Sequence, residues 1–195
     1  NFTIYDQSDS TKLVRNCMRD SDIDTKQYSP KRIQAHISSL KNQRILPGEA
    51  VEFAQSFFDV KVAEIYSSYQ KKLMLANSMD FDDLLIKAVE LLETSDKSLN
   101  YWSSKFQYIM IDEYQDTNMV QYRLVELLAS KHKNICVVGD SDQSIYAFRG
   151  ADIRNIEEFE SDFKNAKVIS LEKNYRSSQK ILDIANAVIS NLSLI

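Results

Sequence analysis

Apolar side chains recur every three or four residues over roughly the first hundred positions, a spacing that predicts helices. The segment "SPKRIQAHISSLKNQRILPG" opens with Ser29 as an N-cap and Pro30 at the first helical position, which favours a helix start there. A longer pattern predicts a second helix from about Glu49 to Ala76. Its apolar stripe consists of Val51, Ala54, Phe58, Val62, Ile65 and Tyr69. Such a stripe is typical of a face packed on a core, with a partner-binding helix as the alternative.

A third helix is predicted to begin after Asp80, which suits the N-cap position. Asp82 and Asp83 then fall in its first turn, where the helix dipole favours negative charge. Helix capping therefore explains these three aspartates without any catalytic role.

Short apolar runs rich in Ile and Val replace the helical pattern after Lys105. The runs are "FQYIMID", "NICVVGD" and "AKVISLE", and each ends in an acidic residue. Between the first two, residues 119–132 predict a helix, with Asn118 as its cap and Gln121 three residues further on. Strand, helix and strand at this spacing predict a βαβ unit with parallel strands. The fold class is therefore α/β, with a mostly helical first half.

Two neighbouring acids, Asp112 and Glu113, follow the first of these strands, and Asp140 follows the second. Parallel sheets bind ligands at the carboxyl ends of their strands. An Asp–Glu pair at that place is the Walker B arrangement of nucleotide triphosphatases, in which the Asp holds Mg²⁺ and the Glu deprotonates water. Surface acids after a strand are the alternative. Gln143 lies just past the second strand, where it could touch a terminal phosphate or the attacking water.

Two aromatic residues, Tyr146 and Phe148, follow in a polar loop beside Arg149. Base stacking would use such side chains, and packing against a neighbouring domain is the alternative. Tyr175 and Arg176 follow the third apolar run. An Arg near a triphosphate can stabilise charge in the transition state.

The composition is that of an ordinary soluble globular protein, with 44% hydrophobic and 27% charged residues. The formal net charge of −4 argues against a general polyanion binder, while a local stacking site for nucleic acid stays open. No signal peptide or membrane-spanning run is apparent. Cys17 and Cys136 lack metal-ligand spacing, and Cys136 is expected to be a buried apolar side chain. Free thiols of this kind favour a cytoplasmic location.

Four segments, in chain order, resemble consecutive motifs of the UvrD/PcrA/Rep family of superfamily 1 DNA helicases, and the PcrA branch is the most similar. They are "MDFDDLL", "IDEYQDTN", "VVGDSDQSIYAFRGAD" and "LEKNYRS". The resemblance covers essentially the whole chain. It implies a fragment of an ATP-dependent 3′–5′ DNA helicase that couples ATP hydrolysis to translocation on single-stranded DNA and to duplex unwinding in repair and replication. The implied partners are single-stranded DNA, junctions of single-stranded and duplex DNA, the rest of the helicase chain and accessory repair proteins, with no membrane.

The resemblance also implies roles for individual residues toward ATP and Mg²⁺. Asp112 would coordinate Mg²⁺ and Glu113 would activate water. Gln143 would sense the γ-phosphate and link it to DNA. Arg176 would reach the γ-phosphate from the second motor domain, and Tyr175 would stack on adenine.

Two further residues, Tyr146 and Phe148, would contact single-stranded DNA, Phe148 by stacking. Relatives usually carry Trp where Phe148 stands. Phe keeps an aromatic face but has less area and no indole N–H, so weaker stacking is expected.

The resemblance divides the chain into three parts of a P-loop NTPase. Residues 1–104 would form a mostly helical insertion subdomain with a helix returning to the core. Residues 105–170 would be the later, parallel-sheet part of the first RecA-like motor domain, and 171–195 the start of the second.

A Walker A loop, G-x-x-x-x-G-K-[ST], does not occur in these 195 residues. The chain is therefore expected to be a piece of a longer protein and to hydrolyse ATP negligibly by itself. Two rival interpretations stay open. One is a helicase–nuclease subunit of the RecB/AddA type, and the other is a non-catalytic module that binds DNA or another protein.

Overall fold

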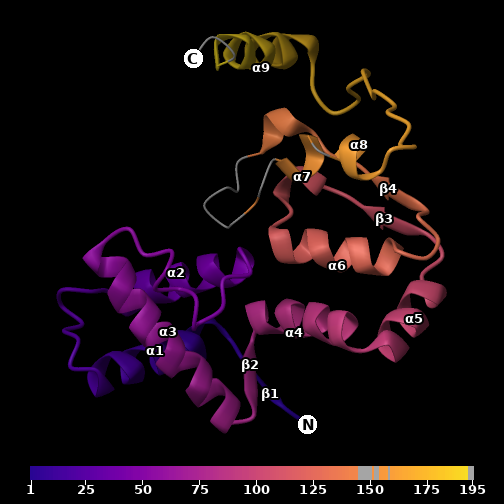
Figure 1. The fold of residues 1–195 in the computed structure, drawn as a ribbon. Coiled ribbons are helices and arrows are strands. Elements are labelled where there is room, and N and C mark those ends of the chain that lie inside the picture. The colour runs from indigo at the N-terminus through magenta and orange to yellow at the C-terminus, as the bar shows by residue number, and fades with distance from the viewer. Residues whose placement is uncertain (145–150, 152–153, 158, 193–195) are drawn as a thin grey trace.

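The computed structural model describes residues 1–144, 151, 154–157 and 159–192 (Figure 1). The first part contains strand β1 (Thr3–Tyr5) and helices α1 (Gln7–Asp20), α2 (Pro30–Asn42) and α3 (Phe57–Leu75). Strand β2 (Ser78–Asp80) and helix α4 (Phe81–Thr94) lead out of this part to α5 (Asp96–Lys105). The later part contains β3 (Ile109–Ile111), η1 (Tyr114–Asp116), α6 (Met119–Ala129), β4 (Ile135–Val137), η2 (Ser141–Gln143), α7 (Arg154–Glu157), α8 (Phe159–Asp162) and α9 (Gln179–Leu192).

Helices α1, α2 and α3 enclose the larger apolar core among the described residues, on the left of Figure 1. Val14, Ile33 and Leu73, one from each helix, have no exposed surface. Burying each such side chain contributes about 1.5–3 kcal/mol. The helix predicted to start after Ser29 is confirmed, with Ser29 at the N-cap position but no side-chain capping hydrogen bond.

Helix α3 begins at Phe57, so the predicted start near Glu49 is wrong. Residues 47–53 form turns instead, and Val51, the first residue of the predicted stripe, is 57% exposed. Ser56 fixes the true start, because its Oγ accepts the backbone N–H of Asp59 at 3.2 Å. The later part of the predicted stripe is confirmed, since Val62, Ile65 and Tyr69 are buried.

A short parallel pair of strands, β1 and β2, ties the N-terminus to the end of α3, and the sequence did not predict it. Helix α4 follows β2 directly, and its predicted N-cap is confirmed. Asp80 Oδ1 accepts the N–H of Asp83 at 2.9 Å, and Asp83 Oδ2 accepts the N–H of Asp80 at 3.3 Å. The two aspartates thus form a reciprocal capping box.

The other oxygens of the same two carboxylates hold a buried lysine. Lys41 Nζ, from the last turn of α2, donates to Asp80 Oδ2 at 2.7 Å and to Asp83 Oδ1 at 2.8 Å. Tyr69 donates its hydroxyl to Asp80 Oδ2 at 2.8 Å, and Gln70 Nε2 donates to Asp83 Oδ1 at 3.1 Å. This cluster joins α2, α3 and α4 where the first part of the chain meets the rest.

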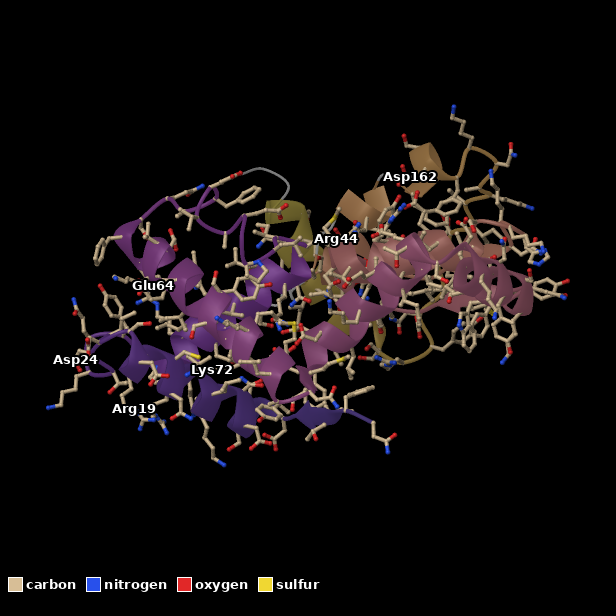
Figure 2. All side chains as sticks on the ribbon, turned by 60° about the horizontal axis from the view of Figure 1, so that its bottom comes forward. Arg19, Asp24, Arg44, Glu64, Lys72 and Asp162 are labelled. Carbon is tan, nitrogen blue, oxygen red and sulfur yellow. The ribbon has the colours of Figure 1, made fainter. Side chains whose placement is uncertain are left out.

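Further polar contacts also join the two parts. Arg44 lies where they meet (Figure 2), and its Nη2 donates to Glu93 Oε2 at 2.8 Å. Arg123 Nε, from α6, donates to the other oxygen of Glu93 at 2.7 Å. Asn118 Nδ2 donates to Asn42 Oδ1 at 2.8 Å, which connects the N-cap of α6 to the end of α2.

A second, smaller core lies between α4, α5 and α6, with Val89, Leu92, Val120 and Leu127 buried in it. The βαβ prediction is confirmed, because β3 and β4 pair in parallel on either side of α6 in the sequence. The predicted capping box of α6 is confirmed as well, since Asn118 Oδ1 accepts the N–H of Gln121 at 2.9 Å.

The third apolar run, residues 166–172, does not join the strand pair. Residues 166–172 form no strand, and Val168, Ile169 and Leu171 are 65–82% exposed. A strand requires a neighbouring strand for its backbone hydrogen bonds, and no backbone hydrogen bond between the described residues joins this run to β3 or β4.

Cys136 is exposed, so its predicted burial is wrong, whereas Cys17 is buried. Cys136 stands opposite Met110 in the β3–β4 pair, and Met110 is 78% exposed, so this face of the pair is uncovered in the described chain. The structure thus combines helices with two small parallel sheets. None of the described helices is both long enough and apolar enough to cross a membrane.

Candidate functional site

The carboxyl ends of β3 and β4 bring the predicted acidic residues to one edge of the strand pair. Ile111 lies opposite Val137, and the ladder continues with Val138 N–H donating to Ile111 O at 2.8 Å. Asp112 directly follows β3, and Asp140 lies three residues after β4. The predicted placement of these acids is therefore confirmed in the structure.

Asp112 and Glu113 make a tight turn at the end of β3. Asp112 Oδ1 accepts the N–H of Glu113 at 3.0 Å. No hydrogen bond or ion pair between described residues involves the other oxygen, Asp112 Oδ2. One exposed carboxylate with a free oxygen fits a hard cation such as Mg²⁺, which is bound through one or two carboxylates plus phosphate oxygens and water.

Glu113 adopts a left-handed backbone conformation, with φ at 51° and ψ at 44°. For a residue with a side chain this conformation costs on the order of 1–3 kcal/mol, and such residues cluster at functional sites. The turn is held by the N–H of Tyr114, which donates to Val138 O at 3.0 Å. The backbone of Tyr114 thus fixes Glu113 at the edge of the strand pair.

Gln115 joins the two strand ends, and it was not among the residues predicted for the site. Its side chain is buried, with 1% of the residue exposed. Gln115 Nε2 donates to Glu113 Oε2 at 2.8 Å, and Gln115 Oε1 accepts the N–H of Asp140 at 3.1 Å. A Cβ on Gly139 would lie 2.7 Å from Gln115 Oε1, so this glycine allows the amide its close approach. The glycine after the second strand is the one sequence feature that hints at such an approach.

Gln143 belongs to the same set of hydrogen bonds. Asp140 caps η2, its Oδ1 accepting the N–H of Asp142 at 3.0 Å. Asp140 Oδ2 accepts from Gln143 Nε2 at 2.7 Å. Hydrogen bonds therefore run without interruption from Glu113 through Gln115 and Asp140 to Gln143.

Buried side chains hold the loop that follows Glu113. Asn155 Nδ2, from α7, donates to Thr117 O at 3.0 Å and to its Oγ1 at 3.2 Å. Tyr114 is completely buried and meets the ring of Phe159 edge-on, with ring centres 5.7 Å apart. Burial, with Asp162 nearby, raises the pKa of Tyr114 to about 12, so its hydroxyl stays neutral. The loop is therefore anchored on both sides of Gln115.

The remaining predicted residues are not joined to this site. Tyr175 is 85% exposed, and Lys173 Nζ lies 5.1 Å from the centre of its ring. The N–H of Arg176 donates to Asn174 Oδ1 at 2.9 Å. Within the described chain, neither Tyr175 nor Arg176 bonds to Asp112, Glu113 or Gln143. Tyr146 and Phe148 lie outside the described residues.

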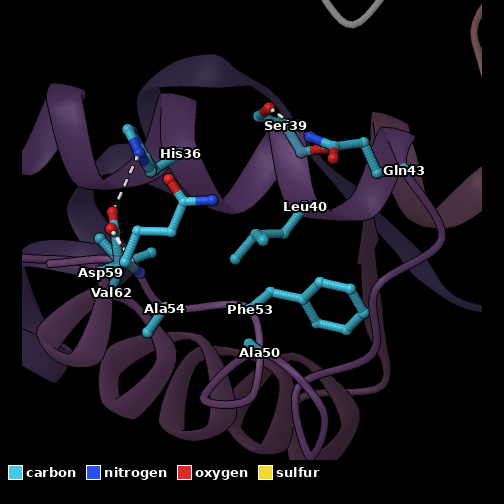
Figure 3. Close-up of a pocket in the computed structure, with 10 residues that line it drawn as sticks. His36, Ser39, Leu40, Gln43, Ala50, Phe53, Ala54, Asp59 and Val62 are labelled. Atoms are coloured by element: carbon cyan, nitrogen blue, oxygen red, sulfur yellow. Dashed lines mark hydrogen bonds and ion pairs between the residues drawn. The ribbon is translucent and has the colours of Figure 1, made fainter.

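A separate pocket of about 240 Å³ lies in the helical first part (Figure 3). Its lining residues are His36, Ser39, Leu40, Gln43, Ala50, Phe53, Ala54, Gln55, Asp59 and Val62. His36 Nε2 and Asp59 Oδ1 lie 3.5 Å apart at one end. None of the predicted site residues lines this pocket, so the candidate site is the edge formed by the ends of β3 and β4.

Comparison with known proteins gives two kinds of match. A family model described as the UvrD/REP helicase N-terminal domain matches residues 1–164. Proteins called "ATP-dependent DNA helicase PcrA" from Staphylococcus aureus (strain Mu50) and Staphylococcus epidermidis are 49% and 48% identical to this chain over 193 residues. The matches cover 99% of this chain but 26% of each relative, so the chain spans about a quarter of their length.

Proposed function

Since this chain belongs to the family of UvrD/REP helicase N-terminal domains, we propose that it is the part of an ATP-dependent DNA helicase that activates water and senses the terminal phosphate. The predicted resemblance to the UvrD/PcrA/Rep family is confirmed. The proposed whole enzyme uses ATP and Mg²⁺, acts on single-stranded DNA and on its junctions with duplex, and moves 3′ to 5′. Repair and replication in the cytoplasm are the proposed setting, with accessory repair proteins as partners.

The observation that carries this proposal is the set of hydrogen bonds linking Glu113 to Gln143 across the ends of two parallel strands. A water-activating carboxylate and a phosphate-sensing amide must act on the same phosphoryl group. Surface acids that merely follow a strand would not require a buried glutamine between them. The geometry therefore favours a shared reaction site over unrelated surface acids at the strand ends.

The chemistry assigned to the site is hydrolysis of the γ-phosphate of ATP. A water oxygen attacks the γ-phosphorus, the bond from that phosphorus to the bridging oxygen of ADP breaks, and Glu113 takes the proton that the water releases. Asp112 would hold Mg²⁺ through its free oxygen, and the bound ion would neutralise charge on the phosphate oxygens. Gln143 would exchange its bond to Asp140 for one to the γ-phosphate.

The other proposed roles use residues beyond this edge. Arg176 would stabilise charge on the γ-phosphate and Tyr175 would stack on adenine, both from the start of a second motor domain at 171–195. Tyr146 and Phe148 would contact DNA bases. We assign 105–170 to a first RecA-like motor domain and 1–104 to a helical insertion.

The test uses the full-length protein that contains this chain, with variants of the two neighbouring acids. Glu113→Gln keeps size but cannot take a proton, so turnover should fall by roughly 10²-fold or more while ATP affinity stays within about threefold. Asp112→Asn removes a charged metal ligand and should weaken Mg²⁺-dependent ATP binding. Steady-state hydrolysis with single-stranded DNA and titration with a fluorescent ATP analogue give both quantities. Equal weakening of ATP binding by the two variants would contradict this division of roles.

A further inference from the structure

The amide of Gln115 has one orientation that satisfies both of its partners. A carboxylate can only accept a hydrogen bond, so the atom facing Glu113 Oε2 at 2.8 Å must be the donor, Nε2. The backbone N–H of Asp140 can only donate, so the atom 3.1 Å from it must be Oε1. In a flipped amide, Nε2 would face the N–H of Asp140, another donor, and Oε1 would face the Glu113 carboxylate, another acceptor. The chemistry of the partners therefore fixes the orientation.

The space around this amide leaves it little freedom to move independently of the two strand ends. The residue is 1% exposed, and the missing Cβ of Gly139 would lie 2.7 Å from Gln115 Oε1 and 2.8 Å from Ile156 Cδ1. Because buried polar groups that lose a partner are costly, a displacement of Asp140 carries the amide with it rather than breaking the bond. Gln115 is therefore a stiff connection between the two strand ends.

The geometry assigns to Gln115 the role of a positioning residue that transmits displacement of the Asp140–Gln143 turn to the carboxylate of Glu113. This inference rests on the proposed function. When Gln143 leaves Asp140 Oδ2 for a terminal phosphate, the turn at Asp140 shifts, and the amide shifts the Glu113 carboxylate with it. Glu113 would then face the attacking water correctly when Gln143 has engaged the phosphate. Gln115 does not itself touch the reacting atoms.

Two variants of the full-length protein test this role. Gln115→Leu keeps the bulk of the side chain and removes both hydrogen bonds. Gln115→Glu keeps an acceptor for Asp140 but replaces the donor that faces Glu113 with a second carboxylate oxygen. For both, DNA-stimulated kcat should fall roughly tenfold to a hundredfold, with KM for ATP and affinity for single-stranded DNA within about threefold of wild type.

The matched control is Gln34→Leu in the helical first part. Gln34 is another buried glutamine, 9% exposed, and its Oε1 accepts from Gln7 Nε2. Its loss should lower the melting temperature but leave kcat within about twofold, since it touches no part of the site. The control separates loss of folding stability from loss of the positioned carboxylate.

The outcomes test the positioning role of Gln115 separately from the proposed hydrolase function. A fall in kcat of more than fivefold at unchanged KM, in whichever Gln115 variants fold, supports the positioning role. A kcat within fivefold of wild type, or a rise in KM that matches the fall in kcat, overturns it while the hydrolase function stands. Wild-type protein that shows no DNA-stimulated hydrolysis overturns the proposed function instead, and that result is read before any variant is measured.

Discussion

Replacing Lys41 with methionine removes a cation from between two buried carboxylates while keeping most of the side-chain volume. The Lys41 side chain has no exposed surface, and those of Asp80 and Asp83 are 8% and 4% exposed. The ammonium lies 2.7 Å from Asp80 Oδ2 and 2.8 Å from Asp83 Oδ1. After the change, two negative charges remain side by side in the interior with no cation between them.

The expected cost follows from these distances. At an effective dielectric constant of about 20, each contact is worth on the order of 6 kcal/mol of Coulomb attraction. Desolvation of the three charges offsets most of that gain, but removing one partner leaves the desolvation of the others uncompensated. The free energy of unfolding should therefore fall by about 3–5 kcal/mol, which is a large part of the 5–15 kcal/mol typical of a folded domain.

Urea unfolding of the 195-residue chain, followed by circular dichroism, measures this loss. A decrease of 3–5 kcal/mol corresponds to a lowering of the urea midpoint by roughly 1–3 M for a typical slope. The control is Lys61→Met, because Lys61 Nζ pairs with Glu64 Oε2 at 2.8 Å but the two side chains are 29% and 45% exposed. Losing that pair should cost no more than about 0.5 kcal/mol.

A triple variant tests the reasoning itself. Combining Lys41→Met with Asp80→Asn and Asp83→Asn removes the buried charge altogether, so part of the lost stability should return. If Lys41→Met lowers the free energy of unfolding by no more than Lys61→Met does, unpaired buried charge is not the cause. The same conclusion follows if Asp80→Asn and Asp83→Asn, added to Lys41→Met, lower the free energy of unfolding further by the sum of their separate effects.

Three smaller predictions follow from other groups. Burial raises the pKa of Asp82 in the folded chain. As pH rises, Asp82 therefore loses its proton in the unfolded chain before it does so in the folded chain, and stability is lost between the unfolded and the folded pKa. Asp82→Asn should therefore stabilise the chain at pH 7 and have no such effect near pH 3, as measured by urea unfolding at both values. The hydrogen bond from Arg123 lowers the pKa of Glu93, so its contribution is present above the ordinary carboxylate pKa and is lost as pH falls through the lowered value. Glu93→Gln should cost at most about 1 kcal/mol at pH 7, less in high salt, and an equal loss at pH 3 would contradict the ion-pair explanation. Cys136 is exposed, whereas Cys17 is buried and burial raises the pKa of its thiol. A thiol reagent should therefore modify one cysteine rapidly in the folded chain and the second on unfolding, and two fast thiols would be the contrary result.

Local patterns in the sequence correctly predicted several elements of the fold. Asp80 caps α4 and Asn118 caps α6, and in both cases the bond spans three residues. A capping residue and the N–H that it satisfies are always near neighbours in the chain, so their identities alone indicate the helix start. The β3–β4 pair was predictable for a related reason, since a helix between two short apolar strands of this spacing requires them to be parallel.

Local patterns were insufficient where two of them competed, and a strand-like composition alone did not produce a strand. The apolar spacing extends back to Val51, but the helix begins only at Phe57, because Ser56 and Asp59 form the cap there. The run at 166–172 has the composition of a strand, yet strand formation depends on a neighbour to bond with, and the run's own residues do not supply one.

For the site, the sequence indicated which residues are candidates for the proposed chemistry, and the tertiary structure decided how they are connected. Asp112, Glu113 and Gln143 could be predicted as candidates because their types and positions after apolar strands suit phosphate chemistry. The connection through Gln115 to Asp140 spans 25 positions, and the bond from Lys41 to Asp80 spans 39. A buried amide or ammonium is stabilised by whatever partners the folded chain brings within about 3 Å of it, and no pattern of neighbouring residues encodes those partners.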